Sequence, residues 1–265
     1  MSVSFNLIAQ QDTRKIMYGV HPQNNLDLFL PVKFDAKTPV IVMLHGGAWA
    51  MGGNEYTDKT ARDLRDRGFV VANVDYRYVN DSVHCVDLLA DIDQAINYLQ
   101  TDAAKKYGFR TTGYNMAGIS AGAHLALLYG YTTKRDIKSI AALCAPSVLD
   151  DAKGLDDIAR KGLIHNIEML ADATYTSGKK VSDAFTAVSP YAQISNVPTL
   201  LFHGDKDDLV PYQSSVILYK ALKNKNVNSK FVTMEGKGHD CGMNQADSEK
   251  RVLDEITAWV NQYSK

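Results

Sequence analysis

The sequence has few cysteines and no excess of charge of either sign. Its 265 residues include only three cysteines, Cys85, Cys144 and Cys241, which are too few and too irregularly spaced for a disulfide framework or a CxxC metal site. The 29 Lys and Arg residues are scattered along the chain and balance 30 Asp and Glu residues, giving a formal net charge of -1. We therefore expect no nucleic-acid partner, because binding to a phosphate backbone requires a basic stripe.

Signals for membranes, secretion and cofactors are also missing. No apolar run approaches the roughly 18 residues of a membrane helix, and the first thirty or so residues lack the basic start, apolar run and cleavage site of a leader. Together with the low cysteine content, this favours a cytoplasmic protein without a membrane partner. The motifs HExxH, GxxxxGK[ST] and GxGxxG do not occur, so we expect no metal and no other cofactor.

What the sequence does contain is a regular alternation of two patterns. Short apolar, β-branched runs alternate with longer helical patterns, which is typical of parallel strands joined by crossover helices. The predicted strands span residues 26–30, 40–44, 70–75, 114–118, 140–144, 199–203 and 230–234. The predicted helices span residues 58–67, 86–100, 121–131, 214–223 and about 247–262.

This alternation predicts a single α/β domain over residues 1–265. Because the strands are almost continuously apolar, we expect a mostly parallel sheet with helices on both faces. Residues 149–189 carry weaker helical patterning and are longer than a crossover requires, so we predict that they form a small lid. On such sheets, ligands bind at the carboxyl ends of the strands, and the residues just after each strand are the candidates for function.

Ser120 is the candidate nucleophile. It is the serine of a G-x-S-x-G motif, Gly118 to Gly122, placed between a predicted strand and a predicted helix. In that context the motif predicts a sharp turn that exposes the serine, and the glycines avoid collisions in the tight bend. A hydroxyl is a weak nucleophile at neutral pH and requires an adjacent base, usually an oriented histidine.

The base and its acid are sought after later strands, in the order serine, acid, histidine. Among the seven histidines, His239 is the best placed, in the turn EGKGH that follows the last predicted strand. The acid is ambiguous among Asp205, Asp207 and Asp208, and we expect the others to fix the loop by bonding nearby backbone N–H groups.

The sequence HGGAW follows the predicted strand 40–44. Acyl transfer passes through an oxyanion that preorganised backbone N–H groups stabilise. Paired glycines let this loop approach a substrate, and the N–H of Ala121 adds a donor from the start of a helix. We therefore predict an oxyanion hole here.

These motifs together resemble a known family. The segments LDLFLP, HGGAW, VDYR, GISAGAHLAL, HGDKDDLVP and GKGH resemble those of α/β-hydrolases, within them the hormone-sensitive-lipase-like and bacterial acetylxylan/feruloyl esterase group of carboxylesterases. The resemblance implies an α/β-hydrolase fold and a triad of Ser120, Asp207 and His239, with Asp207 four residues before Pro211. It also implies oxyanion donors, which are the N–H groups of Gly47, Ala48 and Ala121.

The chain departs from the family pattern at several positions. Ile119 and Ala123 replace the Asp and Gly of the frequent GDSAGG, and Ala48 replaces a third glycine. These changes leave the backbone donors in place. After Tyr76-Arg77, the sequence YVNDS replaces the usual LAPE, which separates the chain from the lipase-like branch proper.

The expected function is hydrolysis of small carboxylic esters, of short-chain acyl or acetyl/feruloyl type, without a cofactor. We expect acyl preference to depend on a pocket around Trp49, Tyr76 and residues 149–189. One alternative is an aryl formamidase acting on N-formylkynurenine, since HGGAW is shared with that group. A second is a hydrolase-fold binding protein without catalysis, which the intact triad disfavours. The sequence leaves the oligomeric state open, a homodimer being one possibility.

Overall fold

The computed structural model describes residues 11–265, and their eight strands form one sheet in the order β1-β2-β4-β3-β5-β6-β7-β8. Strand β2 runs antiparallel to both of its neighbours, and every other pair from β4 to β8 is parallel, as predicted. The strands are β1 (Gln11–Met17), β2 (Asn25–Leu30), β3 (Val40–Leu44), β4 (Val70–Val74), β5 (Tyr114–Ile119), β6 (Ile137–Leu143), β7 (Thr199–Gly204) and β8 (Ser229–Met234).

Helices lie between most of the strands. They are α1 (Asp58–Asp66), α2 (Cys85–Tyr98), α3 (Ala104–Tyr107), α4 (Ala121–Thr132), α5 (Ala152–Arg160), α6 (Ile164–Ala171), α7 (Asp183–Ala187), α8 (Tyr212–Asn224) and α9 (Ala246–Tyr263). A π-helical segment, Leu99–Ala103, connects α2 to α3. Within the described residues, no helix is long and apolar enough to cross a bilayer.

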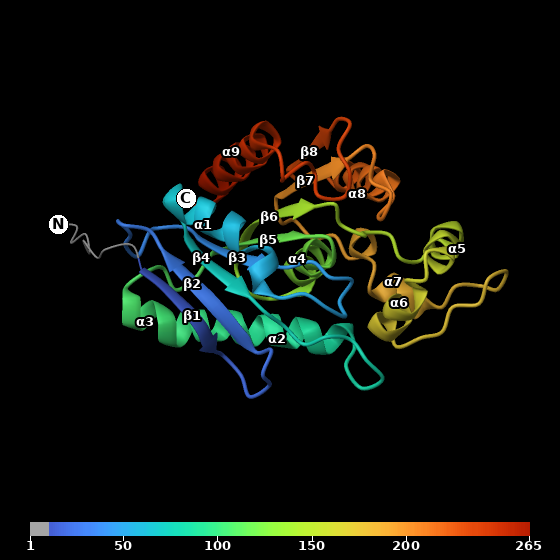
Figure 1. Ribbon diagram of the computed structural model, residues 1–265, viewed down its shortest axis with the longest axis horizontal. Helices are drawn as coiled ribbons and strands as arrows, with labels where there is room; N and C mark the ends of the chain where they lie inside the picture. Colours follow the sequence, from blue (N-terminus) through green and yellow to red (C-terminus); the bar gives the residue numbers. More distant parts are fainter. Residues whose placement is uncertain (1–10) are drawn as a thin grey trace.

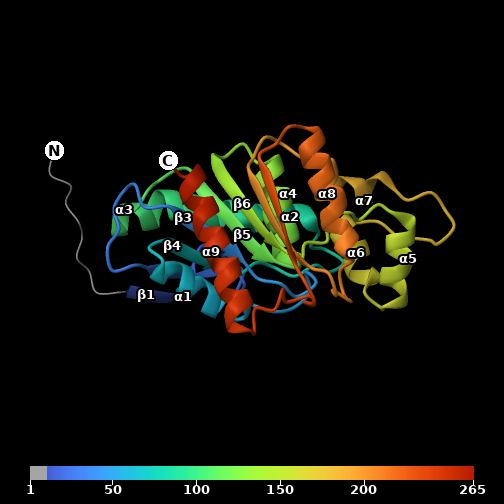
Figure 2. The same ribbon diagram turned by 90° about the horizontal axis from the view of Figure 1, so that it is seen from above.

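The alternation of side chains along the strands builds two hydrophobic cores, one on each face of the sheet. In β3, the side chains of Val40, Val42 and Leu44 pack into the core that contains residues of α2, α4 and α8. Those of Ile41 and Met43 point the other way and pack with residues of α1 and α9. Figures 1 and 2 show the resulting three layers, with α1 and α9 on one face of the sheet and α2 and α4 on the other.

The carboxyl ends of the parallel strands lie along one edge of the sheet. Strand β5 is followed directly by Ser120 and then by α4. In the parallel pair of β7 and β8, Gly204 at the end of β7 lies opposite Met234 at the end of β8. The loops that follow β3, β5, β7 and β8 therefore emerge at the same edge. The 149–189 segment, predicted as a lid, contains the short helices α5, α6 and α7 and lies beyond this edge (Figure 1).

Candidate active site

Ser120 occupies the turn between β5 and α4 in a conformation that is rare for a residue with a side chain. Its φ is 54° and its ψ is -122°, outside the regions that are favourable for L-residues. The turn also requires the two glycines of the motif. A Cβ at Gly118 would lie 2.5 Å from the carbonyl carbon of Gly122, and a Cβ at Gly122 would lie 2.2 Å from the oxygen of Leu44. The motif thus places the serine in a tight turn at the carboxyl end of β5.

The structure brings Ser120, His239 and Asp207 into one hydrogen-bonded chain. The Nε2 atom of His239 lies 2.8 Å from the Oγ of Ser120, and its Nδ1 atom lies 2.8 Å from Oδ2 of Asp207. Because a carboxylate only accepts, Nδ1 carries the hydrogen, which leaves Nε2 of the neutral ring as the acceptor for the serine hydroxyl. This is the arrangement in which an imidazole can remove the proton of a nucleophile.

Asp207 is held as an anion. Its side chain is fully buried, and its Oδ1 accepts hydrogen bonds from the N–H groups of Leu209 and Val210, each 2.9 Å long. Burial by itself raises the pKa of the carboxyl, but hydrogen bonds from His203, His239 and the Val210 N–H outweigh it and hold the pKa of Asp207 well below its ordinary value. The acid can therefore orient His239 and stabilise its protonated form at neutral pH.

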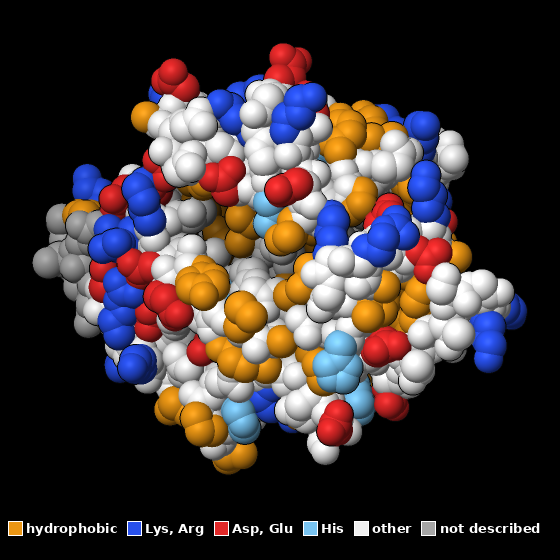
Figure 3. Space-filling view, turned by 45° about the vertical axis from the view of Figure 1, so that its right-hand side comes forward, with side chains coloured by type: hydrophobic (Ala, Val, Ile, Leu, Met, Phe, Trp, Pro, Cys, Tyr) orange, Lys and Arg blue, Asp and Glu red, His pale blue; other side chains and the backbone are white. Residues whose placement is uncertain are grey.

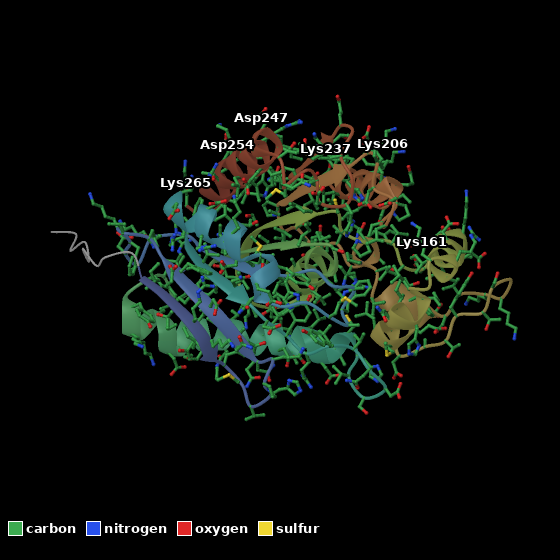
Figure 4. All side chains as sticks on the ribbon, viewed as in Figure 1. Lys161, Lys206, Lys237, Asp247, Asp254 and Lys265 are labelled. Carbon is green, nitrogen blue, oxygen red and sulfur yellow. The ribbon has the colours of Figure 1, made fainter. Side chains whose placement is uncertain are left out.

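The loops that carry the acid and the histidine are fastened to each other. The N–H of Lys206 donates to the carbonyl of Lys237 at 2.9 Å, and Figure 4 shows the two labelled lysines close together above the ends of β7 and β8. Asp205 accepts from the N–H of Gly236 at 2.6 Å, so the prediction that a neighbouring aspartate fixes the loop is confirmed for Asp205. Contacts of this kind hold the loops that carry Asp207 and His239 in a fixed relative position.

Two of the predicted oxyanion donors, Gly47 and Ala48, lie in a loop with an unusual backbone, and the third, Ala121, is the first residue of α4. Gly47, Ala48 and Trp49 have φ values of 124°, 49° and 59° in succession. A Cβ at Gly47 would lie 1.9 Å from the carbonyl oxygen of Met51, so the second glycine of HGGAW is required by space. In residues 11–265, the N–H groups of Gly47, Ala48 and Ala121 donate no backbone hydrogen bond outside regular helix and strand pairing, which leaves them available to a ligand.

A cavity of about 140 Å³ opens at Ser120, and its walls are mostly apolar. Figure 3 shows hydrophobic side chains around a hollow on the corresponding face of the molecule. The walls come from the HGGAW loop, α5, α6, the loop after Asp207 and α8. The lining residues are Ala48, Trp49, Ser120, Ala121, Pro146, Val148, Leu149, Asp151, Gly154, Ile158, Leu163, Ile167, Leu209, Val210, Pro211, Gln213, Ser214 and Ile217.

Trp49 lines the cavity, but the prediction that Tyr76 also lines it is wrong. Tyr76 is fully buried, and its ring stacks on that of His45 with the centroids 4.3 Å apart. Its hydroxyl donates to the carbonyl oxygen of His45 at 2.6 Å, and Asp75 lies 3.0 Å from Nε2 of the same histidine. Tyr76 therefore packs against His45, the first residue of the HGGAW loop, and holds it in place.

No motif in the sequence indicates His124, which links the HGGAW loop to Val188, the residue after α7. The indole N–H of Trp49 can only donate, so Nδ1 of His124, 3.2 Å away, is the acceptor. The hydrogen of His124 is then on Nε2, which donates to the carbonyl of Val188 at 2.7 Å. Burial lowers the pKa of His124 to about 4, so the ring stays neutral at physiological pH and can hold this chain of bonds.

The neutral, buried His124 predicts a specific pH dependence of stability. Its pKa is below the value of about 6.5 in an unfolded chain, so between about pH 6.5 and 4 the unfolded state binds the extra proton and the folded state loses stability as the pH falls. We expect the free energy of unfolding, measured by urea titration, to fall by roughly 1 kcal/mol per pH unit in this window because of this one group.

Two substitutions show whether His124 causes this loss of stability at low pH. His124→Gln is expected to flatten the slope between pH 6.5 and 4.5, whereas His165→Gln, at a side chain that is 71% exposed, is expected to keep it. Equal slopes for the wild-type protein and His124→Gln would show that His124 is not buried in its neutral form.

Two potential metal ligands, Cys144 and His203, lie next to the candidate acid Asp207, and all three side chains already have hydrogen-bonding partners. In the described part of the chain, ligand atoms of Cys144, His203 and Asp207 lie within 4.8 Å of one another. The hydrogen bond with Cys241 and burial raise the pKa of the Cys144 thiol, and the thiol already has Cys241 as a partner. Asp207 already accepts from His239. We therefore regard this cluster as packing around the acid, with Cys144 and Cys241 as free thiols whose sulfur atoms are 3.1 Å apart.

Comparison with known proteins places the chain in a family. The family model described as BD-FAE matches residues 26–222. The chain belongs to the BD-FAE family. This match covers the HGGAW loop, Ser120 and Asp207, and it stops before His239. The BD-FAE region thus includes residues 149–189 and most of the sheet.

Curated relatives of this BD-FAE protein include plant methylesterases. A probable isoprenylcysteine alpha-carbonyl methylesterase from Oryza sativa subsp. japonica is 29% identical over 252 residues, which are 89% of this chain and 59% of the relative. The isoprenylcysteine alpha-carbonyl methylesterase of Arabidopsis thaliana is 28% identical, covering 87% of this chain and 57% of the relative. The chain therefore spans less than two thirds of the length of these relatives.

Solved structures confirm the predicted α/β-hydrolase fold. A truncated carbohydrate esterase from gut microbiota superimposes with a TM-score of 0.78 at 20% identity, over 98% of both chains. Esterase B from Lactobacillus rhamnosis superimposes with a TM-score of 0.78 at 19% identity, over 96% of this chain and 86% of that one. At these identities the likeness establishes the fold.

Proposed function

We propose that this BD-FAE protein is a serine carboxylesterase that cleaves small esters through an acyl-enzyme. The observation that carries the proposal is the chain of two hydrogen bonds, each 2.8 Å long, from Ser120 through His239 to Asp207. The methylesterase and esterase names of its relatives support the same reaction class. A hydrolase-fold binding protein without catalysis would have no need of this alignment or of the rare backbone conformation at Ser120.

In the proposed reaction, the Oγ of Ser120 attacks the ester carbonyl while Nε2 of His239 takes its proton. The carbonyl oxygen becomes an oxyanion and accepts hydrogen bonds from the N–H groups of Gly47, Ala48 and Ala121. His239 then gives its proton to the departing alcohol as the C–O bond breaks. Water, deprotonated by the same histidine, hydrolyses the acyl-enzyme and restores Ser120.

The walls of the cavity favour an apolar group on the substrate. Apolar side chains from α5, α6 and α8 surround the space next to Ser120, and Asp151 is the one charged residue among those lining it in the described structure. Each methylene buried there contributes about 0.8 kcal/mol. We propose esters with a short apolar acyl chain as substrates, and the name of the plant relatives adds isoprenylcysteine methyl esters as candidates to include.

A substrate series tests this proposal. We expect kcat/KM for p-nitrophenyl esters to rise by about tenfold from acetate to butyrate, because two further methylenes are buried. An isoprenylcysteine methyl ester and N-formylkynurenine complete the series. Absence of turnover with every ester, from a folded protein, would contradict the proposal.

The second candidate is an aryl formamidase, and one observation favours it. HGGAW is shared with that group, and here its Trp49 lines the cavity beside Ser120, where an aromatic ring of a substrate could pack against the indole. The same catalytic groups would cleave a formamide. A kcat/KM for N-formylkynurenine far above that for the acetyl and butyryl esters would decide for this alternative.

A further inference from the structure

A buried histidine, His203, contacts the same carboxylate oxygen of the candidate acid as His239 does. His203 is the penultimate residue of β7 and is fully buried. Its Nε2 lies 3.0 Å from the carbonyl oxygen of Val210 and 3.1 Å from Oδ2 of Asp207. Both oxygens are acceptors, so Nε2 carries a hydrogen in either charge state of the ring. Its hydrogen bond goes to the Val210 carbonyl, and Oδ2 of Asp207 lies within contact distance of the same N–H group.

The ring of His203 is fixed by further contacts. Its Nδ1 lies 2.6 Å from the Oγ of Ser215 in α8, and in the neutral ring this nitrogen accepts the hydroxyl hydrogen. Ser215 is almost completely buried, and the ring of Tyr212 packs edge-on against His203 at 5.8 Å between centroids. The imidazole therefore has little freedom to turn away from Asp207.

We propose that His203 is a positioning residue for Asp207, acting on catalysis through the acid and through His239. This proposal rests on the proposed function of the triad. Oδ1 of Asp207 is fastened by two backbone N–H groups, whereas Oδ2 must point at His239. The hydrogen on Nε2 of His203 secures that oxygen and the Val210 carbonyl at the same time, so it fixes both the carboxylate and the loop that carries it.

The contact also affects the charge that His239 meets. A donor that shares Oδ2 draws negative charge away from the oxygen that accepts from Nδ1 of His239. Without this donor, Oδ2 attracts the protonated form of His239 more strongly. We therefore expect the acidic limb of the activity profile to move to higher pH when this donor is lost.

Two substitutions of similar polarity separate positioning from simple packing. A glutamine at 203 extends its amide nitrogen about as far as Nε2 of histidine and can donate to Asp207, whereas an asparagine extends its nitrogen only about as far as Nδ1. His203→Asn is expected to lower kcat for p-nitrophenyl butyrate by about 10- to 100-fold, the factor for a lost hydrogen bond to a charged group. We expect KM to change by less than about threefold, because His203 does not line the cavity.

The conservative variant and the pH profile complete the test. His203→Gln is expected to recover most of kcat, and the acidic limb of kcat/KM is expected to lie at higher pH in His203→Asn than in the wild-type protein and His203→Gln. Thermal unfolding of each variant reports folding separately. If His203→Asn and His203→Gln lose kcat equally, or if the acidic limb does not move upward in His203→Asn, the positioning role is wrong.

Failure of the triad gives a different result. In that case the wild-type protein itself hydrolyses none of the esters and does not react with a fluorophosphonate. If the wild-type protein is active and both His203 variants match it in kcat and pH profile, only the role of His203 is overturned.

Discussion

Replacing Ser120 with alanine is expected to lower kcat for p-nitrophenyl esters by about four to six orders of magnitude, with the fold retained. The substitution removes the only hydroxyl that lies 2.8 Å from Nε2 of His239 in the described structure. The remaining activity would come from the oxyanion donors and from substrate binding, which accelerate attack by water without a nucleophilic serine.

Initial rates of hydrolysis by matched variants measure this effect. Ser82→Ala is a suitable control, because Ser82 is exposed in the loop between β4 and α2, and it is expected to keep the wild-type rate. Circular dichroism checks that each protein is folded. Equal rates for the wild-type protein and a folded Ser120→Ala would remove Ser120 from the mechanism.

The second large effect is expected from Gly122→Ala, through folding. A Cβ at this position would lie 2.2 Å from the oxygen of Leu44 and 2.3 Å from the oxygen of His45. Both are backbone atoms, at the end of β3 and at the start of the HGGAW loop, so neither can rotate away. We expect the free energy of unfolding to fall by about 3 kcal/mol or more, or the protein to fail to fold.

A second glycine of the same helix provides the control for the urea titration. At Gly130, a Cβ would meet the Cδ1 of Ile140 at 2.6 Å, and this atom is the end of a side chain that can move. In addition, alanine favours the helix over glycine by about 1 kcal/mol. Gly130→Ala is expected to stay within about 1 kcal/mol of the wild-type protein. If Gly122→Ala were equally stable, the close approach of α4 to β3 would be wrong.

The sequence predicts the buried parts of the fold well because burial leaves a clear pattern. Val40–Leu44 has the predicted bounds, and the other predicted strands differ by a few residues at their ends. Strand β1, Gln11–Met17, was missed. Its sequence, QDTRKIM, is mostly polar, because β1 is an edge strand with a single neighbour, β2, and therefore lacks the continuous apolar run of a central strand.

Some residues of the candidate site can be predicted from short local motifs, whereas others depend on contacts between distant parts of the sequence. Ser120, Asp207 and His239 can be predicted because each follows a strand within a short motif, and parallel strands end at one edge of the sheet. Tyr76 also follows a strand, but it turns beneath His45 and away from the cavity. Position after a strand therefore indicates nearness to the site without indicating which way a side chain points.

The supporting contacts could not be predicted because they join residues that are distant in the sequence. Trp49 and His124 are 75 positions apart and bond through their side chains. Cys144 and Cys241 are 97 positions apart and their sulfur atoms touch, although their spacing gives no sign of pairing. His203 is only four residues from Asp207, and this short spacing within HGDKD is the one signal that could have indicated its contact with the acid.

Covalent labelling with a fluorophosphonate tests most directly whether Ser120 is an activated nucleophile. The wild-type protein, Ser120→Ala and His239→Ala would be treated alike, and the intact mass and the modified peptide determined. The proposed mechanism predicts one adduct per wild-type chain, located on Ser120, none on Ser120→Ala, and much slower labelling of His239→Ala. An unlabelled wild-type protein, or an adduct on another residue of a protein that hydrolyses esters, would contradict it.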